Sequence, residues 1–343
     1  MLNLNGKSIL ITGGTGSFGK MFTKLIFERS PDVKKLVIFS RDEQKHFQMA
    51  QEFSSTQYPA IRYFIGDVRD KSRLKRAFEG IDIVIHAAAM KHVHLAEYNP
   101  IECVKTNISG AENVIDVALE TGVNRVIALS TDKAAAPINL YGATKLASDK
   151  LFVAANNIKG KRDVRFSVVR YGNVMGSNGS VMPFFLNKKK NGEKFLPITD
   201  NKMTRFNISL EDGCEMVFYA IEKAWGGEIF IPKIPSYKIS DVATAIAPDM
   251  IQKVVGIRPG EKLHEEMITA SDSYNTVDIG KYYVILPQKS PYSQYSKEEY
   301  KKAFNGVDVS RGFSYNSGSN NNWETVDSLR KLVKTHVDPN FIA

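Results

Sequence analysis

The chain has 343 residues, of which 43% are hydrophobic and 24% are charged. This is the composition of an ordinary globular protein, and it excludes a disordered, collagen-like or low-complexity chain. The net charge of +9 comes without a long basic stretch interleaved with aromatic residues, so we expect no nucleic-acid partner. At roughly 150 residues per domain, the length predicts two units or one large domain with a smaller appendage.

Other features of the composition indicate a reducing compartment. Cys103 and Cys214 are isolated thiols without CxxC spacing, which argues against a disulfide scaffold or a zinc finger. No apolar run approaches the roughly 20 residues of a membrane helix, and the first residues lack the basic and apolar regions of a secretory signal. We therefore expect a cytoplasmic protein with no membrane span.

The first half of the chain alternates strand-like and helix-like segments. Apolar, β-branched runs without polar alternation are typical of strands buried on both faces. They predict strands at residues 8–12, 35–40, 61–66, 83–87, 125–130 and 166–170. Helical patterns fill the gaps, for example at residues 17–29, 73–78, 111–120 and 141–155. This repetition predicts an α/β fold with a Rossmann-like, doubly wound parallel sheet.

After about Tyr171 the texture of the sequence changes, because Gly, Pro and Asn become frequent. A helix at residues 210–224 and a strand at 228–231 are expected, and residues 312–322 are expected to form a loop. We expect a first domain of residues 1–171 with about 207–226. Residues 172–206 and 227–343 should form a smaller C-terminal lobe that packs against the carboxyl edge of the sheet.

A glycine-rich turn follows the first predicted strand, with glycines at every third position from residue 13 to residue 19. Gly13 lets the chain turn off the strand, Gly16 lets the backbone approach a pyrophosphate, and Gly19 lets the helix pack on the sheet. The helix N-terminus offers free N–H groups and the positive end of its dipole to the phosphates. The turn predicts a dinucleotide site in the first domain, contacted by Gly13, Thr15, Gly16, Ser17, Phe18 and Gly19.

The end of the second strand indicates which dinucleotide binds. An NAD enzyme usually has an acid there to bind the ribose 2′-hydroxyl, but this chain has Ser40-Arg41, with Lys45 one helical turn on. Arg41 and Lys45 can clamp a 2′-phosphate, which favours NADP over NAD. Asp67 is placed to accept from the adenine amine or to cap a helix. Further cofactor contacts are expected from Asp42, Val68, Ala87, Ala88, Lys91 and Val174.

Tyr141 and Lys145 form a Tyr-x-x-x-Lys motif on one face of a predicted helix. The lysine charge lowers the tyrosine pKa and binds the nicotinamide ribose, so the phenolate can remove a hydroxyl proton as hydride leaves. The motif is common by chance, but here it joins the glycine turn and Ser130-Thr131 at the end of the fifth strand. In this combination the chain resembles the extended short-chain dehydrogenase/reductase family over nearly its whole length.

The residues after the fifth strand narrow this resemblance. Epimerases of the superfamily carry no acid–base pair after Thr131, and sugar-nucleotide 4,6-dehydratases usually carry Asp-Glu, whereas this chain has Asp132-Lys133. This pair is accompanied by matching motifs at residues 137–145, 170–174, 203–206 and 256–262. The sequence thus resembles the inverting, 5-epimerising UDP-N-acetylglucosamine 4,6-dehydratases, which start bacterial pseudaminic acid synthesis for flagellin glycosylation.

The resemblance implies a redox-neutral reaction. Tyr141 takes the proton of the sugar 4-hydroxyl while C4 gives hydride to NADP, with Thr131 as a contact to the oxygen. Lys133 removes the C5 proton if a desolvated site holds it neutral, and protonated Asp132 gives its proton to the departing 6-hydroxyl. Hydride returns to C6, and reprotonation on the opposite face inverts C5.

The same resemblance implies a site for UDP-N-acetylglucosamine. The diphosphate calls for arginine forks or backbone N–H groups, for which Arg205, Arg258 and the 176–180 turn are candidates. Asn173 is expected at a substrate amide, Lys91 at the sugar or nicotinamide, and Glu261 at the uridine ribose. The other expected contacts are Ser177, Gly179, Ser180, Val181, Thr199 and Met203.

Two positions depart from the pattern of the family. His94 stands where relatives usually have proline, and Asn178 stands where they tend to have arginine, which puts one phosphate contact in doubt. His92 and His94 have no third ligand at a sensible spacing, so no metal site is expected.

Three other functions stay open on this fold. The first two are a retaining 4,6-dehydratase and a UDP-sugar 4-epimerase. The third is a non-catalytic NADP-binding regulator, although such proteins usually lose the Tyr or the Lys of the motif, and both are present here. The resemblance also implies a homo-oligomer, specifically a hexamer.

Overall fold

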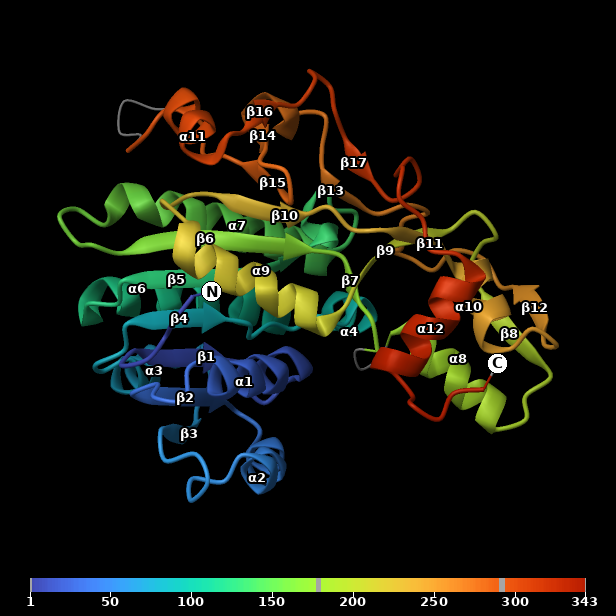
Figure 1. Ribbon diagram of the computed structural model, residues 1–343, viewed down its shortest axis with the longest axis horizontal. Coiled ribbons are helices and arrows are strands. Elements are labelled where there is room, and N and C mark those ends of the chain that lie inside the picture. Colours follow the sequence, from blue (N-terminus) through green and yellow to red (C-terminus); the bar gives the residue numbers. More distant parts are fainter. Residues whose placement is uncertain (1, 177–179, 290–293, 343) are drawn as a thin grey trace.

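The computed structural model describes residues 2–176, 180–289 and 294–342. Within these residues a ten-stranded sheet forms the centre of the fold, in the order β16-β14-β15-β10-β6-β5-β4-β1-β2-β3 (Figure 1). Seven of its strands are parallel: β1 (Ser8–Thr12), β2 (Lys35–Ser40), β3 (Ile61–Ile65), β4 (Ile83–His86), β5 (Arg125–Thr131), β6 (Arg165–Tyr171) and β10 (Ile229–Pro232). Three antiparallel strands extend one edge: β14 (Thr276–Asp278), β15 (Tyr282–Ile285) and β16 (Val307–Asp308).

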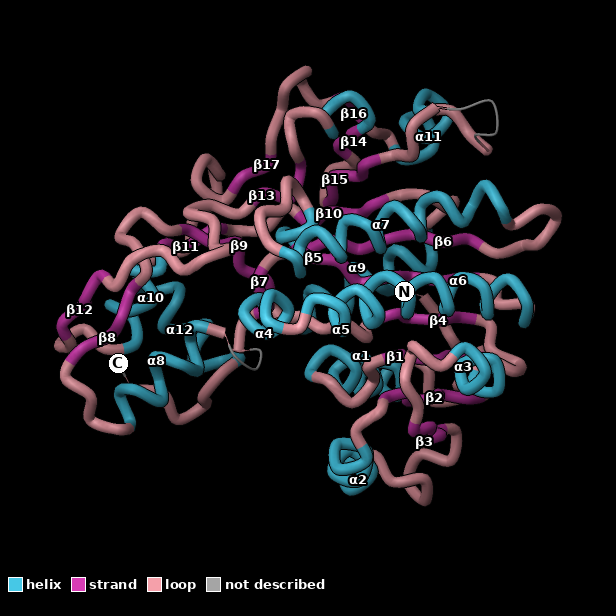
Figure 2. Tube along the Cα trace, turned by 180° about the vertical axis from the view of Figure 1, so that it is seen from behind, coloured by secondary structure: helices cyan, strands magenta, loops and turns pink. Residues whose placement is uncertain are grey.

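Helices cover both faces of this sheet. On one face lie α1 (Ser17–Arg29) and α9 (Leu210–Lys223), which pack against each other. On the other lie α3 (Lys71–Ala77), α6 (Gly110–Thr121) and α7 (Leu140–Ile158) (Figure 2). Every residue of β1 and β4 is buried, as their uninterrupted apolar sequences require in a sheet covered on both sides. The expected Rossmann-like fold is therefore confirmed.

A smaller lobe has a hydrophobic core of its own. It contains α8 (Val181–Lys190), α10 (Ile239–Ile246), α12 (Val326–His336) and the two-stranded sheet of β8 (Phe195–Ile198) and β12 (Ile251–Val254). Between the lobe and the large sheet runs a three-stranded sheet of β7 (Asn173–Val174), β9 (Thr204–Ile208) and β11 (Ser236–Lys238). In Figure 1 the lobe lies beyond the carboxyl ends of the parallel strands.

The division of the chain differs from the expected one. The sequence analysis assigned residues 227–343 to the lobe, but β10 pairs in parallel with β6, and β14, β15 and β16 continue the same sheet. The reason is hydrophobic, since Ile229, Phe230 and Ile231 are all buried in the large core. Residues 312–322, expected to be a loop, include β17 (Tyr315–Asn316), which pairs with β13 (Glu266–Ile268).

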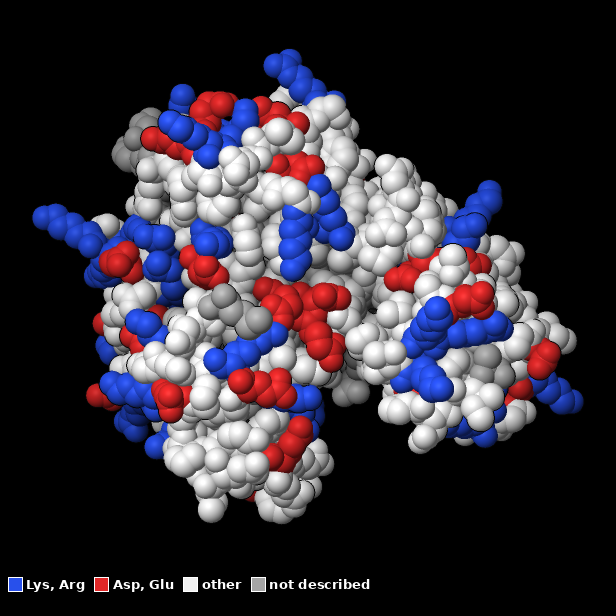
Figure 3. Space-filling view, viewed as in Figure 1, with Lys and Arg blue, Asp and Glu red and all other residues white. Residues whose placement is uncertain are grey.

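The remaining helices are short or connect larger elements. They are α2 (Glu43–Glu52), α4 (Val93–Tyr98), α5 (Pro100–Val104) and α11 (Lys297–Phe304), with a π-helical turn at Lys105–Ser109 that runs into α6. No helix among the described residues is both long and apolar enough to cross a membrane. On the face drawn in Figure 3, Lys and Arg side chains are interspersed with Asp and Glu.

Candidate active site

Close contacts within the protein require glycine at two positions of the turn between β1 and α1. Gly13 has φ +66°, and a Cβ there would lie 2.9 Å from the Cα of Ala88, in the loop after β4. Ala87 and Ala88 are held to the end of β1 by hydrogen bonds to Thr12. A Cβ on Gly19 would clash with the carbonyl oxygen of Gly14. These two glycines are therefore needed for the fold as well as for a ligand.

Gly16 is less crowded by the protein than Gly13 or Gly19. A Cβ there would meet only the Gly13 carbonyl oxygen, at 3.3 Å. Gly16 is the N-cap of α1, and no side chain caps that helix. The first-turn N–H groups, including those of Ser17 and Phe18, therefore have no side-chain acceptor and suit an anion such as a pyrophosphate. The residues of this turn fit a dinucleotide.

The tip of β2 presents two exposed cations. Thr15 donates a hydrogen bond of 2.9 Å to Ser40 at the strand end. The Arg41 side chain is 63% exposed, and its guanidinium lies 3.7 Å from Asp67. Lys45 lies 3.6 Å from Asp42, whose carboxylate also caps α2 by accepting from the Lys45 backbone N–H. Both cations are thus accessible to a phosphate.

Other expected cofactor residues have protein partners. Asp67 accepts hydrogen bonds from both the backbone and the side chain of Arg69, and these bonds lower its pKa although burial opposes them. Val68 packs against Gly110 of α6. Desolvation by the surrounding protein lowers the pKa of Lys91, and repulsion from Lys45 lowers it further. The contacts of Asp67 with adenine and of Lys91 with the sugar or nicotinamide stay predictions.

The end of β5 carries a compact charged cluster. β5 ends at Thr131 and the chain turns through a short 3-10 helix at Asp132–Ala134. The Lys133 Nζ lies 3.1 Å from Asp132 Oδ1, 3.2 Å from Glu265 Oε1 and 3.4 Å from Asn173 Oδ1. The Thr131 hydroxyl donates to the same Asp132 oxygen at 2.9 Å. Four of these residues, Thr131, Asp132, Lys133 and Asn173, were expected in the site, and Glu265 was not.

Helix α7 brings Tyr141 to this cluster. Asn139 caps the helix by accepting from the Gly142 N–H at 2.7 Å, and it donates to the carbonyl oxygen of Gly260 at 2.7 Å. A Cβ on Gly142 would clash with the carbonyl oxygen of Lys133. The close approach that Gly142 permits therefore sets the distance between the Tyr141 helix and the Lys133 turn.

The charge state of Lys133 differs from the expectation. Burial acts to lower the pKa of Lys133, but the carboxylates of Asp132 and Glu265 together outweigh it and raise the pKa above its ordinary value. This direction favours the ammonium form of Lys133 in the ligand-free protein, whereas the expected mechanism needs its neutral amine. Burial raises the pKa of Asp132 despite the neighbouring lysine, which favours the protonated acid that the expected mechanism needs.

The pair Tyr141 and Lys145 also behaves differently from the expectation. Burial raises the pKa of Tyr141 to about 12, and the groups that oppose this rise are Lys133 and a hydrogen bond with Thr131. Lys145 is buried, and this burial lowers its own pKa while Asp149 raises it in part. The cation that acts most on the Tyr141 hydroxyl is therefore Lys133 rather than Lys145.

The sequence analysis missed three members of the cluster. Glu265 is 2% exposed and lies 3.8 Å from the Arg205 Nε. Tyr237 on β11 is buried, and burial raises its pKa although Arg205 and Asn173 act to lower it. Lys262 donates a hydrogen bond of 2.7 Å to the Ala135 carbonyl oxygen. Lys262 ends the recognised 256–262 motif and Glu265 follows it by three residues, whereas Tyr237 lies next to no recognised motif.

The expected substrate residues are spread around this centre. Arg205 is buried and donates to the carbonyl oxygens of Thr204 and Leu263. Arg258 is exposed and lies 3.6 Å from Glu261, whose second carboxylate oxygen is buried with no partner among the described residues. Their contacts to a nucleotide stay predictions.

The other expected substrate residues line the start of the lobe. Ser180 is the N-cap of α8, and its buried hydroxyl has no partner among the described residues. Val181 begins that helix, Met203 is buried in the lobe core, and Thr199 is half-buried after β8. Ser177, Asn178 and Gly179 lie outside the described residues. His94 is exposed on α4.

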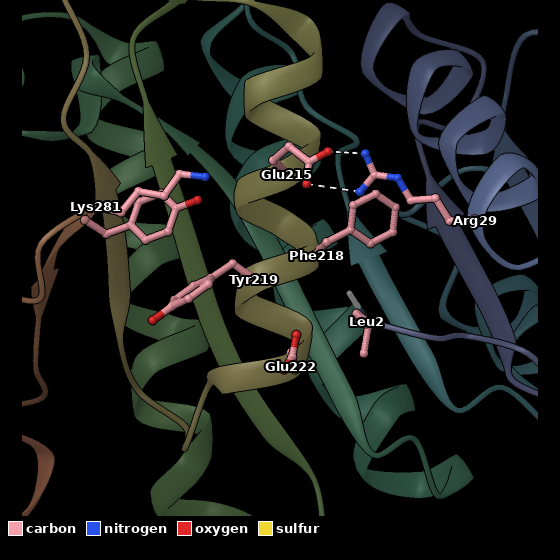
Figure 4. A pocket seen from close by; sticks show the side chains of 8 residues that line it. Leu2, Arg29, Glu215, Phe218, Tyr219, Glu222 and Lys281 are labelled. Atoms are coloured by element: carbon pink, nitrogen blue, oxygen red, sulfur yellow. Dashed lines mark hydrogen bonds and ion pairs between the residues drawn. The ribbon is translucent and has the colours of Figure 1, made fainter. Parts of the chain in front are cut away.

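The structure has one cavity beside the glycine turn and another beside Arg29 and Glu215. One, of about 160 Å³, has Ser17, Val174, Gly176 and His336 in its wall, so it joins the dinucleotide turn to β7 and the lobe. The other, of about 140 Å³, lies on the α9 face away from the cluster (Figure 4). Its wall includes the ion pair of Arg29 with Glu215 and none of the expected site residues.

Comparison with known proteins shows the family of this chain. The profile of the polysaccharide biosynthesis protein family matches residues 9–287. The chain belongs to this family. A member from Campylobacter jejuni (serotype O:23/36, strain 81-176), named UDP-N-acetylglucosamine 4,6-dehydratase (inverting), is 56% identical over 335 residues, which cover 96% of this chain and 98% of the relative. The resemblance inferred from the motifs is therefore confirmed.

Other known proteins are also similar to this chain. A UDP-glucose 4-epimerase of Rickettsia canadensis is 40% identical over 285 residues, 81% of this chain and 82% of the relative. The solved structure of Pen from Bacillus thuringiensis matches with a TM-score of 0.86 and 36% identity, covering 96% of this chain and 98% of that one. DesIV, a dTDP-glucose 4,6-dehydratase from Streptomyces venezuelae with NAD and TYD bound, matches at 22% identity, 75% and 86% coverage and a TM-score of 0.66, which shows the shared fold.

Proposed function

We propose that this chain converts UDP-N-acetylglucosamine to UDP-2-acetamido-2,6-dideoxy-β-L-arabino-hexos-4-ulose. The steps are C4 oxidation, 4,6-dehydration and C5 epimerisation. The observation that carries the proposal is the Asp132-Lys133 pair at the end of β5, beside Tyr141 and within hydrogen-bond distance of Asn173. The name of the Campylobacter relative at 56% identity supports the same reaction.

In this proposal each residue of the cluster handles one proton. Tyr141 removes the proton of the 4-hydroxyl, and the resulting 4-ketone acidifies the hydrogen at C5. Lys133 removes that hydrogen, and protonated Asp132 gives its proton to the departing 6-hydroxyl. General acid–base assistance of this kind contributes roughly 10²–10⁴-fold per group. Because Lys133 is an ammonium ion in the ligand-free protein, it has to lose a proton before the C5 step.

We further propose NADP as the cofactor. Held by the α1 turn and the residues at the tip of β2, a nicotinamide dinucleotide would supply reversible hydride transfer, which would make the overall reaction redox-neutral. The uncapped first turn of α1 supports a pyrophosphate site. The exposed cations Arg41 and Lys45 at the tip of β2 support a 2′-phosphate beside the ribose.

The biological setting is proposed from the family resemblance. We infer that the reaction is the first step of pseudaminic acid biosynthesis for flagellin glycosylation, in the cytoplasm. The two cysteines of the chain are free and buried among the described residues, which suits a reducing compartment. A homo-oligomer, specifically a hexamer, is proposed on the same resemblance.

One experiment separates this reaction from the main alternative. The purified protein is incubated with UDP-N-acetylglucosamine and NADP, and the sugar nucleotide is analysed by mass spectrometry. A dehydratase yields a product lighter by one water. A UDP-sugar 4-epimerase, which the Rickettsia relatives favour by name, yields an isomer of unchanged mass. An unchanged mass with active, folded protein would reject the proposal.

A further inference from the structure

The Lys133 ammonium contacts two carboxylates that come from distant parts of the chain. Asp132 is its neighbour in sequence, whereas Glu265 lies just before β13 and reaches Nζ from the opposite part of the fold, at 3.2 Å. Glu265 is 2% exposed, and its Oε2 is buried with no hydrogen-bond partner among the described residues. Burying an ionised carboxylate without full pairing costs free energy. The buried position of Glu265 therefore indicates a specific role.

The position of Glu265 is set by the C-terminal part of the chain. The Glu265 N–H donates to the Ser317 hydroxyl oxygen at 2.9 Å, and the Ser317 N–H donates to the Glu265 carbonyl oxygen at 2.8 Å. The Ser317 hydroxyl also lies 2.7 Å from that of Thr204 on β9. A Cβ on Gly318 would lie 2.6 Å from the His264 ring, so this segment packs against the 264–265 backbone without free space.

The surroundings shift the pKa values of the two carboxyl groups beside Lys133 in opposite directions. Burial raises the pKa of Asp132. Burial also acts on Glu265, but Lys133, Arg205 and Lys262 outweigh it and lower its pKa. Neighbouring groups with divergent pKa values take different roles in acid–base chemistry. These directions favour the ionised form of Glu265 and the protonated form of Asp132.

We propose that Glu265, fixed in place by Ser317, is a positioning residue that holds Lys133 Nζ against Asp132 and Asn173 and supplies its lasting counter-charge. This role lets Asp132 act as a neutral acid without leaving the ammonium unpaired. The inference deepens the proposed function, because it rests on Lys133 as the C5 base. Ser317 and Gly318 lie beyond residue 287, where the match to the family profile ends.

The sign of the expected effect follows from the groups that face Lys133. They are Asp132 on its own turn, Glu265 before β13, Arg205 on β9, Tyr141 on α7, Tyr237 on β11 and Lys262. Of these, Glu265 is a negative charge that favours the ammonium form, while Arg205 disfavours it. Removing the Glu265 charge therefore lowers the pH at which Lys133 becomes a neutral amine.

The test measures the titration of Lys133 directly, without substrate. The ligand-free protein is labelled with trace acetic anhydride across a pH series, and modification of Lys133 is followed by peptide mass spectrometry, because only the neutral amine reacts. For Glu265→Gln we expect the labelling midpoint to fall by about one pH unit or more, equivalent to about a tenfold rise in neutral amine at a fixed pH below it. Glu265→Asp, which keeps the charge, should restore most of the wild-type midpoint.

Matched variants separate this role from a general loss of packing. Ser317→Ala should also lower the labelling midpoint, by a smaller amount. If Glu265→Gln does not fold, the midpoint of Ser317→Ala tests the positioning role. Glu266→Gln and Ser319→Ala, at positions next to the network, should leave it unchanged. Equal midpoints in wild type, Glu265→Gln and Ser317→Ala would overturn the inference.

The labelling result is independent of the proposed reaction. If wild-type protein does not dehydrate the sugar nucleotide but the midpoints shift as expected, the proposed function fails and the positioning role of Glu265 stands. If dehydration occurs and the midpoints coincide, the role of Glu265 fails alone. With active protein, the rate of C5 hydrogen exchange should move along the pH axis in parallel with the labelling midpoint.

Discussion

The Nζ of Lys133 lies 3.1 Å from Oδ1 of Asp132, the residue before it in the chain. The two residues lie on the 3-10 turn at Asp132–Ala134, directly after β5. In the proposed mechanism, the proton donor for the 6-hydroxyl and the base for C5 therefore lie on one short turn. The predictions below depend on this arrangement.

Lys133→Met should stop removal of the C5 hydrogen while leaving the dinucleotide bound. Methionine keeps the unbranched apolar stem but has no amine, and the loss of an acid–base group costs roughly 10²–10⁴-fold in rate. Uptake of solvent deuterium at C5 measures the step, and NADP fluorescence quenching measures binding. Lys150→Met, at an exposed position on α7, is the control; rapid C5 exchange in Lys133→Met would remove the lysine from the mechanism.

The pH dependence of the C5 step follows from the raised pKa of Lys133. At neutral pH the ammonium form dominates. As long as the pH is below the pKa of Lys133, each increase of one pH unit raises the fraction of neutral amine about tenfold. The rate of C5 exchange should therefore rise with pH through the mildly alkaline range. A rate that falls over this range while the protein stays folded would contradict a lysine base.

Arg41→Ala should weaken NADP binding selectively. A charge-assisted hydrogen bond contributes about 1.5–3 kcal/mol, which corresponds to about a 10–100-fold loss of affinity for the 2′-phosphorylated cofactor. NAD, which lacks that phosphate, should bind nearly as before. Isothermal titration with both dinucleotides gives the ratio, and Lys34→Ala at the other end of β2 is the control. Equal losses for NADP and NAD would assign Arg41 a structural role.

Two alanine substitutions in the glycine turn should have separable effects. Gly19→Ala places a Cβ against the Gly14 carbonyl oxygen, and overpacking of this kind costs about 1–3 kcal/mol of stability or more. Gly16→Ala meets only one atom, at 3.3 Å, so its Tm should change little while dinucleotide affinity falls. Thermal melts with and without NADP distinguish the two outcomes. A destabilised apo Gly16→Ala would show that this glycine serves the fold.

Tyr141→Phe should bind both ligands but fail at the first step. The phenylalanine preserves the packing of a ring that is 9% exposed, yet it has no hydroxyl to take the 4-hydroxyl proton. We expect a fall in turnover of roughly 10²–10⁴-fold, measured by transient NADPH absorbance in a single turnover. Undiminished NADPH formation would exclude Tyr141 as the base for oxidation.

Local patterns were sufficient to predict the first half of the fold. The bounds expected for β1, β2 and α1 are those of the structure, because buried parallel strands and the glycine turn leave strong local signals. The edge strands β14, β15 and β16 left weaker signals, since they are short and their pairing depends on partners far along the chain.

The candidate site was predicted in part for the same reason. Asp132, Lys133 and Tyr141 lie within ten residues of one another and form motifs. Glu265 reaches Lys133 only because β13 pairs with β17 and Ser317 fixes the backbone. The pKa of Lys133 depends in part on that long-range contact, so burial alone, which acts to lower it, does not decide its direction.

The most direct test of the account is proton NMR of UDP-N-acetylglucosamine incubated with the protein and NADP in D₂O. The account predicts a 4-keto-6-deoxy sugar that carries deuterium at C5 and has the L-arabino configuration at that carbon. A product that keeps its 6-hydroxymethyl group, or one that loses water but retains the original configuration at C5, would contradict it.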